Sequence, residues 1–323
     1  MLRRCAAGGR LGRARRHGVY TQFVLDGGRG PLSGQWVDPR SPVGLQWVLS
    51  RLNLAPSQRW GQNFLIDREI FEAMVNLLNC DSVPAQVLEI GPGVGGLTLT
   101  LLEHGASVIG IEIDQRVKPV LDHLARRFPA QLTTLYQDAL SISWADALRQ
   151  VGWESANVVG NVPYYLTAPL LGRLLVLDFP WHRAVFMVQR EVAQRLLTDP
   201  GHRNTSALSV LLRYKMDVRE GIPLIAPDRF SPRPEVQSAV IQLIRHPNLA
   251  VDWHAYRRIV RAGFQHRRKT LRKCLSAVWS EIAWPDVLSA LNIASRARAE
   301  ELTLDQWTRL AAALKEAEEQ SLR

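Results

Sequence analysis

Four consecutive residues, Asn161-Val162-Pro163-Tyr164, combine groups that can hold and orient a planar amine. They follow the apolar run 157–160, so they stand at the end of an expected strand. Pro163 has no backbone donor and keeps Val162 extended, which leaves the Val162 carbonyl free to face a ligand. Asn161 Oδ1 and this carbonyl can accept the two protons of an exocyclic amino group while Tyr164 stacks on the ring. The arrangement suits adenine; the plainer interpretation is a turn with a buried tyrosine.

A second candidate segment is an apolar strand that runs into a glycine-rich loop and then a helix, over residues 86–102. Glycines let the backbone approach a ligand closely at a helix N-terminus. A dinucleotide site would show the order G-x-G-x-x-G, whereas residues 89–95 read Glu-x-Gly-x-Gly-x-Gly. This order is typical of S-adenosylmethionine sites, and it predicts that cofactor beside Glu89, Gly91 and Gly93.

Two further strand ends carry acids that can bind the same cofactor. The strand 108–113 ends in Glu112-Ile113-Asp114, and the strand 132–137 ends in Asp138-Ala139. An acid at the tip of the second strand can accept both ribose hydroxyls. Asp138 can accept the adenine amino group, with Ala139 beside it.

These residues must be positioned by a sheet, because the strands alternate with helical patterns and read as continuous apolar runs. Such runs indicate parallel strands covered on both faces, and ligands bind beyond the carboxyl ends of the strands. The sequence predicts an α/β domain with a parallel sheet over residues 43–246. Near its end, the proline-rich loop 226–236 presents Phe230, which either closes over the target base opposite Tyr164 or packs against the sheet.

The composition changes after residue 246, where strand patterns stop and residues 247–323 read as a small all-helical domain. Between His246 and Leu275 there are eight basic residues and one acid, a net charge of +7. A single helix expected over 256–275 would gather them on one face, where unbalanced charge favours phosphate contacts over mere solvation. The expected RNA-binding residues are Arg258, Arg261, Arg267, Arg268, Lys269 and Arg272.

The overall composition agrees with a polyanionic partner and excludes several other classes. The net charge is +10, the isoelectric point is near 10.1, and no apolar run is long enough to span a membrane. The three cysteines and eight histidines show no ligand spacing, so we expect no metal. Residues 1–42 are expected to be a disordered extension; a transit peptide or an early start codon are alternatives.

The chain thus carries seven motifs in order: Gln62-Asn63-Phe64-Leu65, Glu89-Ile90-Gly91-Pro92-Gly93-Val94-Gly95, Glu112-Ile113-Asp114, Asp138-Ala139-Leu140, Asn161-Val162-Pro163-Tyr164, the loop 230–238 and Arg267-Arg268-Lys269-Thr270-Leu271. In order and spacing they closely resemble the ribosomal RNA adenine N6,N6-dimethyltransferases of the KsgA/RsmA type, over about residues 44–314. Trp60 and Val162 are conservative departures from the family's pattern. The loop 202–207 lacks the aromatic and arginine often found there, so its RNA contacts are in doubt.

The resemblance implies a Rossmann-like, S-adenosylmethionine-dependent methyltransferase domain over residues 43–246, followed by a small all-helical RNA-binding domain. It also implies an enzyme that transfers two methyl groups to each of two adjacent adenines, in a hairpin near the 3′ end of small-subunit rRNA. The substrate would be a late assembly intermediate, and the enzyme a cytoplasmic monomer. The implied S-adenosylmethionine contacts are Asn63, Leu65, Gly91, Glu112, Asp138 and Asn161, with Gln62 beside them. Asn161, Pro163, Tyr164 and Phe230 are the expected catalytic residues.

Three other functions share part of this pattern. A large-subunit rRNA adenine methyltransferase of the macrolide-resistance type has the same cofactor motifs, although Arg267-Arg268-Lys269-Thr270 and Gln189-Arg190-Glu191 fit the small-subunit type better. A non-catalytic RNA-binding assembly factor or a transcription factor would not need an intact Asn-x-Pro-Tyr. A DNA adenine methyltransferase is more remote, since no DNA-reading module is visible.

Overall fold

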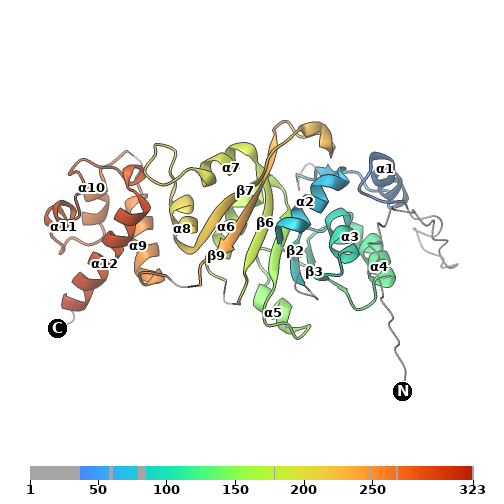
Figure 1. The fold of residues 1–323 in the computed structure, drawn as a ribbon, viewed down its shortest axis with the longest axis horizontal. Coiled ribbons are helices and arrows are strands. Elements are labelled where there is room, and N and C mark those ends of the chain that lie inside the picture. The colour runs from blue at the N-terminus through green and yellow to red at the C-terminus, as the bar shows by residue number, and fades with distance from the viewer. Residues whose placement is uncertain are drawn as a thin grey trace, which may run out of the picture.

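The computed structural model describes residues 37–57, 61–78, 85–177, 179–247, 249–266 and 268–321. Seven strands form one sheet in the order β4-β3-β2-β5-β6-β9-β7 (Figure 1). They are β2 (Gln86–Ile90), β3 (Ser107–Glu112), β4 (Leu132–Tyr136), β5 (Asn157–Asn161), β6 (Arg183–Gln189), β7 (Met216–Ile225) and β9 (Ser238–Arg245). Two short strands, β1 (Phe64–Leu65) and β8 (Phe230–Ser231), pair with each other outside this sheet.

The strands from β2 to β6 are parallel, as the sequence predicted, whereas β9 runs antiparallel to both β6 and β7. The chain builds β2, β3 and β4 outward and then returns to place β5 on the other side of β2. The strand order therefore reverses between β2 and β5. A reversal of this kind opens a crevice at the carboxyl ends of the two strands.

Successive strand residues point to opposite sides of the sheet, and helices cover both sides, so both faces are buried. On β2, Val87 packs in one core, and Leu88 and Ile90 pack in the other. The first core includes α1 (Pro42–Arg51), α2 (Arg68–Leu78), α3 (Gly96–Glu103) and α4 (Lys118–Arg127). The second includes α5 (Trp144–Arg149), α6 (Thr167–Leu174), α7 (Arg190–Leu197) and α8 (Ala207–Lys215).

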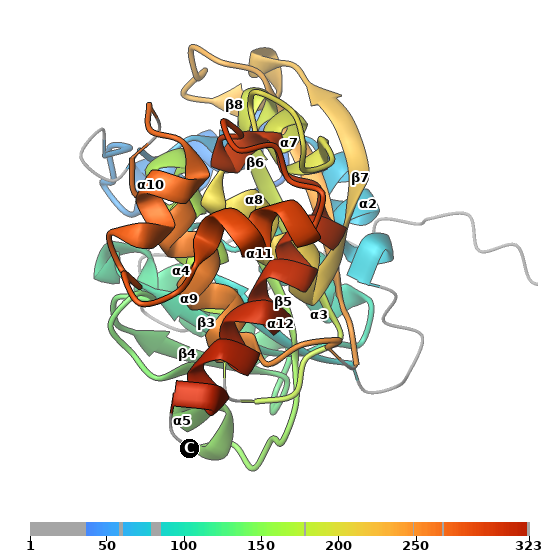
Figure 2. The same ribbon diagram turned by 90° about the vertical axis from the view of Figure 1, so that its left-hand side faces the viewer.

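Four helices, coloured orange to red, gather at one end of the molecule, and Figure 2 views that end directly. They are α9 (Trp253–Gly263), α10 (Leu271–Ser276), α11 (Trp284–Ala290) and α12 (Leu304–Ser321). Their buried side chains continue the second core without a break. At the junction the ring of Tyr214 on α8 stacks on Tyr256 of α9, with centroids 3.7 Å apart. This is the predicted helical C-terminal region, and its boundary as a separate domain stays a prediction.

The single helix expected over 256–275 is wrong, because the structure has two helices there. Helix α9 ends at Gly263, where a Cβ would lie 2.5 Å from the ring of Trp307, so the chain passes too close to α12 for a larger residue. The backbone N–H of Leu271, the first residue of α10, donates instead to Ala297 O at 2.8 Å. The basic residues are therefore divided between two helices and the turn that joins them.

The disordered extension expected to reach residue 42 is also wrong for its last residues. Arg40 is only 4% exposed, and its guanidinium forms ion pairs with Asp38 and with Glu103 at the end of α3, both at 2.7 Å. Ser41 caps α1 by accepting from Gly44 N. Residues 37–42 therefore pack against the helix that follows the glycine loop, while residues 1–36 lie outside the described part of the chain.

Candidate active site

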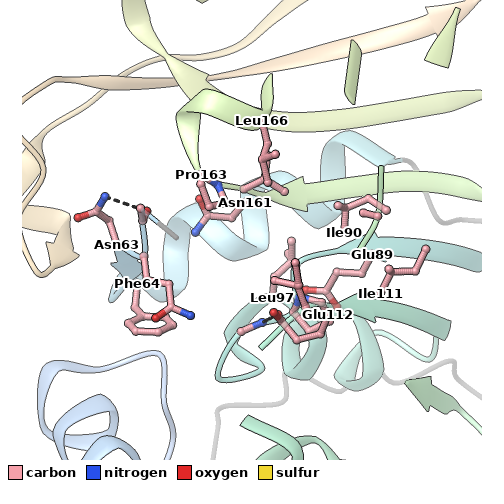
Figure 3. A pocket seen from close by; sticks show the side chains of 18 of the residues that line it. Asn63, Phe64, Glu89, Ile90, Leu97, Ile111, Glu112, Asn161, Pro163 and Leu166 are labelled. Carbon is pink, nitrogen blue, oxygen red and sulfur yellow. Dashed lines mark hydrogen bonds between the residues drawn. The ribbon is translucent and has the colours of Figure 1, made fainter. Parts of the chain in front are cut away.

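A cavity of about 340 Å³ opens at the carboxyl ends of the parallel strands, where the strand order reverses. Its size is within the range usual for small-molecule sites. Figure 3 shows Asn161, Phe64 and Glu112 around the same open space. Every catalytic and cofactor residue expected from the sequence lines this cavity: Gln62, Asn63, Leu65, Glu89, Gly91, Gly93, Glu112, Asp138, Ala139, Asn161, Pro163, Tyr164 and Phe230.

The glycine loop between β2 and α3 brings backbone into the cavity wall. Gly91 and Gly93 have φ values of 71° and 55°, a left-handed conformation that favours glycine. A Cβ on Gly93 would lie 3.3 Å from the ring of Phe64, and one on Gly91 would lie 3.6 Å from Val162. Side chains at these positions would fill the space between loop and opposite wall, so the glycines keep the cradle open for a ligand.

The acid at the tip of β3 is held in place by backbone donors. Glu112 Oε2 accepts from Gly93 N and Oε1 accepts from Asp114 N, both at 2.8 Å. Burial raises the pKa of Glu112, and these hydrogen bonds act against the rise. Each carboxylate oxygen keeps a further lone pair, so the group can also accept from two ligand hydroxyls.

Glu89 lies deeper, under the glycine loop, and is 1% exposed. The Thr98 hydroxyl donates to its Oε2 at 2.7 Å. Burial raises the pKa of Glu89 to about 8, although the bond from Thr98 lowers it. The side chain therefore holds its proton at neutral pH in the absence of a cation, and a cationic ligand in the cavity would favour its ionised form.

Two of the expected cofactor residues differ in how their polar atoms are used. Asp138 lies at the exposed rim of the cavity, whereas the side chain of Gln62 hydrogen-bonds within the protein. Asp138 Oδ1 accepts from Leu140 N at 2.8 Å, so its carboxylate is aimed by the turn after β4. The Gln62 amide donates to Asp114 Oδ2 at 2.9 Å and accepts from Ser57 N at 2.8 Å. Gln62 lines the cavity, but its polar atoms serve the protein's own structure.

The acceptor motif follows β5 directly. Within the described residues, neither the Asn161 amide nor the Val162 carbonyl makes a hydrogen bond, although both lie at the cavity. The Tyr164 hydroxyl instead forms a 2.6 Å hydrogen bond with the buried Ser238 Oγ, which fixes the ring. Two polar groups that are free for a ligand thus stand beside one immobilised aromatic ring, as the sequence interpretation requires.

Phe230 is fixed in the wall and is not presented by a projecting loop. It is 4% exposed and lies on β8, in register with Leu65 of β1. Its neighbour Arg229 forms a 2.6 Å ion pair with Asp67, which caps the start of α2. The expectation that Phe230 packs is confirmed, since the ring belongs to the core of that sheet face, and it also lines the cavity. Its closure over a target base stays a prediction.

Several cavity residues were missed by the sequence reasoning. Ile113 lines the cavity and is 49% exposed, which is unusual for a large apolar residue. Its position between the two acids of Glu112-Ile113-Asp114 could have indicated that it contacts the ligand. Tyr165 is 58% exposed at the rim. Ser238, the partner of Tyr164, is 74 residues away in sequence, and no local pattern points to it.

A second cavity, of about 370 Å³, adjoins the first on the acceptor side. The two share Gly61, Gln62, Asn63 and Tyr164. The outer wall of the second cavity is the loop with three prolines, including Arg233, together with Gln189 at the end of β6. A ligand entering from this side would reach Tyr164 before it met the glycine loop.

The expected RNA-binding residues are placed unequally. Arg258 forms a bidentate ion pair with Glu318 on α12, at 2.6 and 3.1 Å, and its guanidinium lies over the Trp279 ring. Four others are exposed and form no ion pair with any described residue: Arg261, Arg268, Lys269 and Arg272. Arg267 lies outside the described residues.

Two negative findings apply to the described ranges. No group of three or more His, Cys, Asp or Glu side chains is arranged to hold a metal ion. No described helix combines the length and apolar character needed to cross a bilayer.

Comparison with known proteins connects this geometry to a family. A family model for ribosomal RNA adenine dimethylase matches residues 55–316. Ribosomal RNA small subunit methyltransferase A of Magnetococcus marinus is 36% identical over 271 residues, covering 83% of this chain and 95% of the relative. The protein of that name from Anaeromyxobacter sp. (strain K) is 39% identical over 276 residues, covering 81% and 95%.

Two solved structures share the fold. A dimethyladenosine transferase from Plasmodium falciparum superposes with a TM-score of 0.65 at 22% identity, over 78% of this chain and 98% of that one. The 23S rRNA methyltransferase ErmE superposes with a TM-score of 0.61 at 23% identity, over 78% and 100%. The fold is thus shared with a dimethyladenosine transferase and with a 23S rRNA methyltransferase.

Proposed function

Because the chain belongs to the ribosomal RNA adenine dimethylase family, we propose that it transfers methyl groups from S-adenosylmethionine to N6 of two adjacent adenines in the 3′-terminal hairpin of small-subunit rRNA. The products would be N6,N6-dimethyladenines. The partner is ribosomal RNA. We further propose that the substrate is an assembly intermediate of the small subunit and that the enzyme acts as a monomer in the cytoplasm.

The observation that carries this proposal is the pair of free acceptors at the place where the two cavities meet. The Asn161 amide and the Val162 carbonyl have no partner among the described residues, and Tyr164 lines both cavities. Both groups face the cavity, so their unused hydrogen-bonding capacity is available to a ligand. An exocyclic amine offers two donors to these two acceptors.

The residues on the cofactor side of the cavity fit S-adenosylmethionine. Gly91 and Gly93 keep open a cradle that any side chain would fill, and Glu112 retains lone pairs for ribose hydroxyls. Asp138 and Ile113 would hold the adenine, while Asn63 and Leu65 line the opposite wall. When bound, the cofactor supplies a methyl group on a positively charged sulfur.

On the acceptor side, the protein's task is to orient a weak nucleophile. The adenine amine is a poor nucleophile because its lone pair is delocalised into the ring. Hydrogen bonds to Asn161 Oδ1 and the Val162 carbonyl favour a pyramidal nitrogen, and the amine's proton leaves to water after transfer. Positioning and preorganised dipoles then supply most of the rate, without a base of unusual pKa.

The target adenine must leave its stack to reach this position, at a cost of a few kcal/mol. The Tyr164 ring is already immobilised by Ser238, so stacking on it costs little side-chain entropy and offsets part of that cost. Phe230 lines the same wall. Arg261, Arg268, Lys269 and Arg272, which form no ion pair with any residue that the structure describes, would bind the flanking phosphates.

The test is to incubate the purified chain and labelled S-adenosylmethionine with unmethylated small and large ribosomal subunits, and to map the labelled base by digestion. We expect label only in the small subunit, at two adjacent adenines. Label confined to the large subunit would establish the resistance-type function instead. Binding to the small subunit without label would leave only a non-catalytic assembly role.

A further inference from the structure

The carboxylate of Asp114 is fully buried, although it lies just beyond the cavity acid Glu112. Its Oδ1 accepts from Nε and backbone N of Arg116, at 2.8 and 3.1 Å. Its Oδ2 accepts from Arg116 Nη2 at 2.7 Å and from Gln62 Nε2 at 2.9 Å. Burial acts to raise the pKa of Asp114, and these hydrogen bonds hold it below its usual value, so the group is a charged anchor.

Gln62 extends this anchor to the segment that covers the cavity. Its side-chain Oε1 accepts from Ser57 N at 2.8 Å, and its backbone N–H donates to Ser57 O at 3.1 Å. One residue therefore joins the chain on both sides of residues 58–60 to Asp114. Both polar atoms of the Gln62 amide are used inside the protein.

The same segment reaches across to the acceptor motif. Next to Gln62, a Cβ on Gly61 would lie 3.3 Å from Pro163 Cβ and 3.6 Å from the Tyr165 ring. On its other side, Asn63 and Leu65 line the cofactor cavity. Segment 61–65 is thus in contact with the acceptor side while it is tied at Gln62 to the end of β3.

Asp114 also acts on the opposite wall of the cavity. Its backbone N–H donates to Glu112 Oε1 at 2.8 Å, and Glu112 is bonded in turn to Gly93 of the glycine loop. A single buried residue therefore contacts both groups that would enclose the ribose end of the cofactor.

We propose that Asp114 and Gln62 are positioning residues whose hydrogen bond holds segment 61–65 over the cavity before S-adenosylmethionine binds. The inference rests on the cofactor assignment and adds a role for two residues that do not touch the reacting atoms. Holding the segment in place beforehand removes the entropy loss that ordering it during binding would cost. Removing the bond should therefore weaken cofactor binding even when RNA is absent.

The test is calorimetric binding of S-adenosylmethionine to the full chain without RNA, together with hydrogen exchange of the 61–65 amides in the ligand-free protein. Gln62→Glu keeps the acceptor for Ser57 N but loses the donor to Asp114 and adds a like charge. We expect its Kd to rise about 10-fold and its segment 61–65 to exchange faster. A wild-type Kd with wild-type exchange would overturn the proposal.

A charge exchange separates positioning from general damage. In the double variant Gln62→Glu with Asp114→Asn, the new amide can donate to the new carboxylate, so this hydrogen bond is restored with its direction reversed. The bond from Arg116 Nη2 to Asp114 Oδ2 is lost in Asp114→Asn alone as well as in the double variant, so it cancels when the single and double variants are compared. We expect the double variant to bind more tightly than Gln62→Glu alone. Fully additive losses would contradict a direct bond between the two residues.

Two further variants keep the result interpretable. Gln62→Met removes the hydrogen bonds without a second carboxylate, and it replaces Gln62→Glu if that variant does not fold. Asp217→Asn is the matched control, because Asp217 pairs with Arg219 at 2.9 Å on β7 and does not line the cavity; its Kd should not change. Failure of the wild-type chain to bind would remove the cofactor site itself, whereas equal binding by wild type and Gln62→Met would remove only the positioning role.

Discussion

The cofactor cavity and the basic C-terminal surface bind by opposite physical means. In the cavity, Glu112 and Asp114 are buried and take their hydrogen bonds from fixed donors, so recognition depends on geometry that was set during folding. On the C-terminal surface, Arg268, Lys269 and Arg272 are exposed and have no ion-pair partner in the described chain.

Added salt should weaken binding at the C-terminal surface, whereas binding in the cavity should depend on the shape of the site. Buried hydrogen bonds are screened little by added ions, whereas phosphate contacts made by exposed cations release counterions and weaken steeply with salt. Cofactor binding should therefore be nearly independent of ionic strength while RNA binding falls. Variants in one region should leave the other region's binding intact.

The largest effect is expected for Asn161→Ala, which removes one of the two acceptors for the target amine. We expect turnover to fall by about 10²- to 10³-fold, as when a preorganised polar group is lost from an active site. Binding of S-adenosylmethionine should be largely preserved and RNA binding unchanged. Single-turnover methylation and calorimetry measure these, and unchanged turnover would exclude the proposed mechanism.

Next is the replacement of Arg268, Lys269 and Arg272 together by Gln. If each contacts a phosphate, RNA affinity at physiological salt should drop by about 10-fold or more, and the slope of log K against log salt should fall by about 2 to 3. The affinity for S-adenosylmethionine should stay the same. An unchanged slope would show that this surface is only solvated.

A smaller effect is expected on the free energy of unfolding, whose dependence on pH should include a contribution from Glu89. Because burial raises the pKa of Glu89 to about 8, the folded chain holds this proton more tightly than the unfolded chain, whose carboxyl titrates near 4.5. Stability is then lost as pH rises from about 4.5 to 8. Glu89→Gln should abolish that loss, so its free energy of unfolding should stay flatter between pH 5 and 8.5 than that of the wild type, as measured by urea unfolding at pH 5, 7 and 8.5. Parallel curves for the two proteins would contradict the raised pKa.

The smallest effect is expected for Arg258→Gln. Among the described basic residues expected to bind RNA, Arg258 is the one that forms an ion pair within the protein. Arg258 is already paired with Glu318, and both side chains are partly exposed. The free energy of unfolding should fall by up to about 1 kcal/mol, with the salt slope of RNA binding unchanged. A slope reduced as much as in the triple variant would show that Arg258 leaves Glu318 for a phosphate.

Much of the site could be predicted because its residues follow strand ends directly. The carboxyl ends of parallel strands meet at one edge, so Gly91, Glu112, Asp138 and Asn161 come together wherever the strand order places them. The C-terminal helix was predicted less well. Helix α9 ends at Gly263, where the chain comes close to Trp307, a residue 44 positions further along the sequence. Such a long-range contact cannot be foreseen from the local pattern.

The sequence alone determined the chemical types available at the sheet edge, the cofactor class and the excess of positive charge, because these follow from short motifs and composition. Only the tertiary structure decided which of those groups remain free. Gln62 and Arg258 are engaged by Asp114 and Glu318, and Tyr164 is immobilised by Ser238, whereas the Asn161 amide has no partner in the described chain. Hydrogen-bond partners distant in sequence are chosen by packing, and packing is a property of the whole fold.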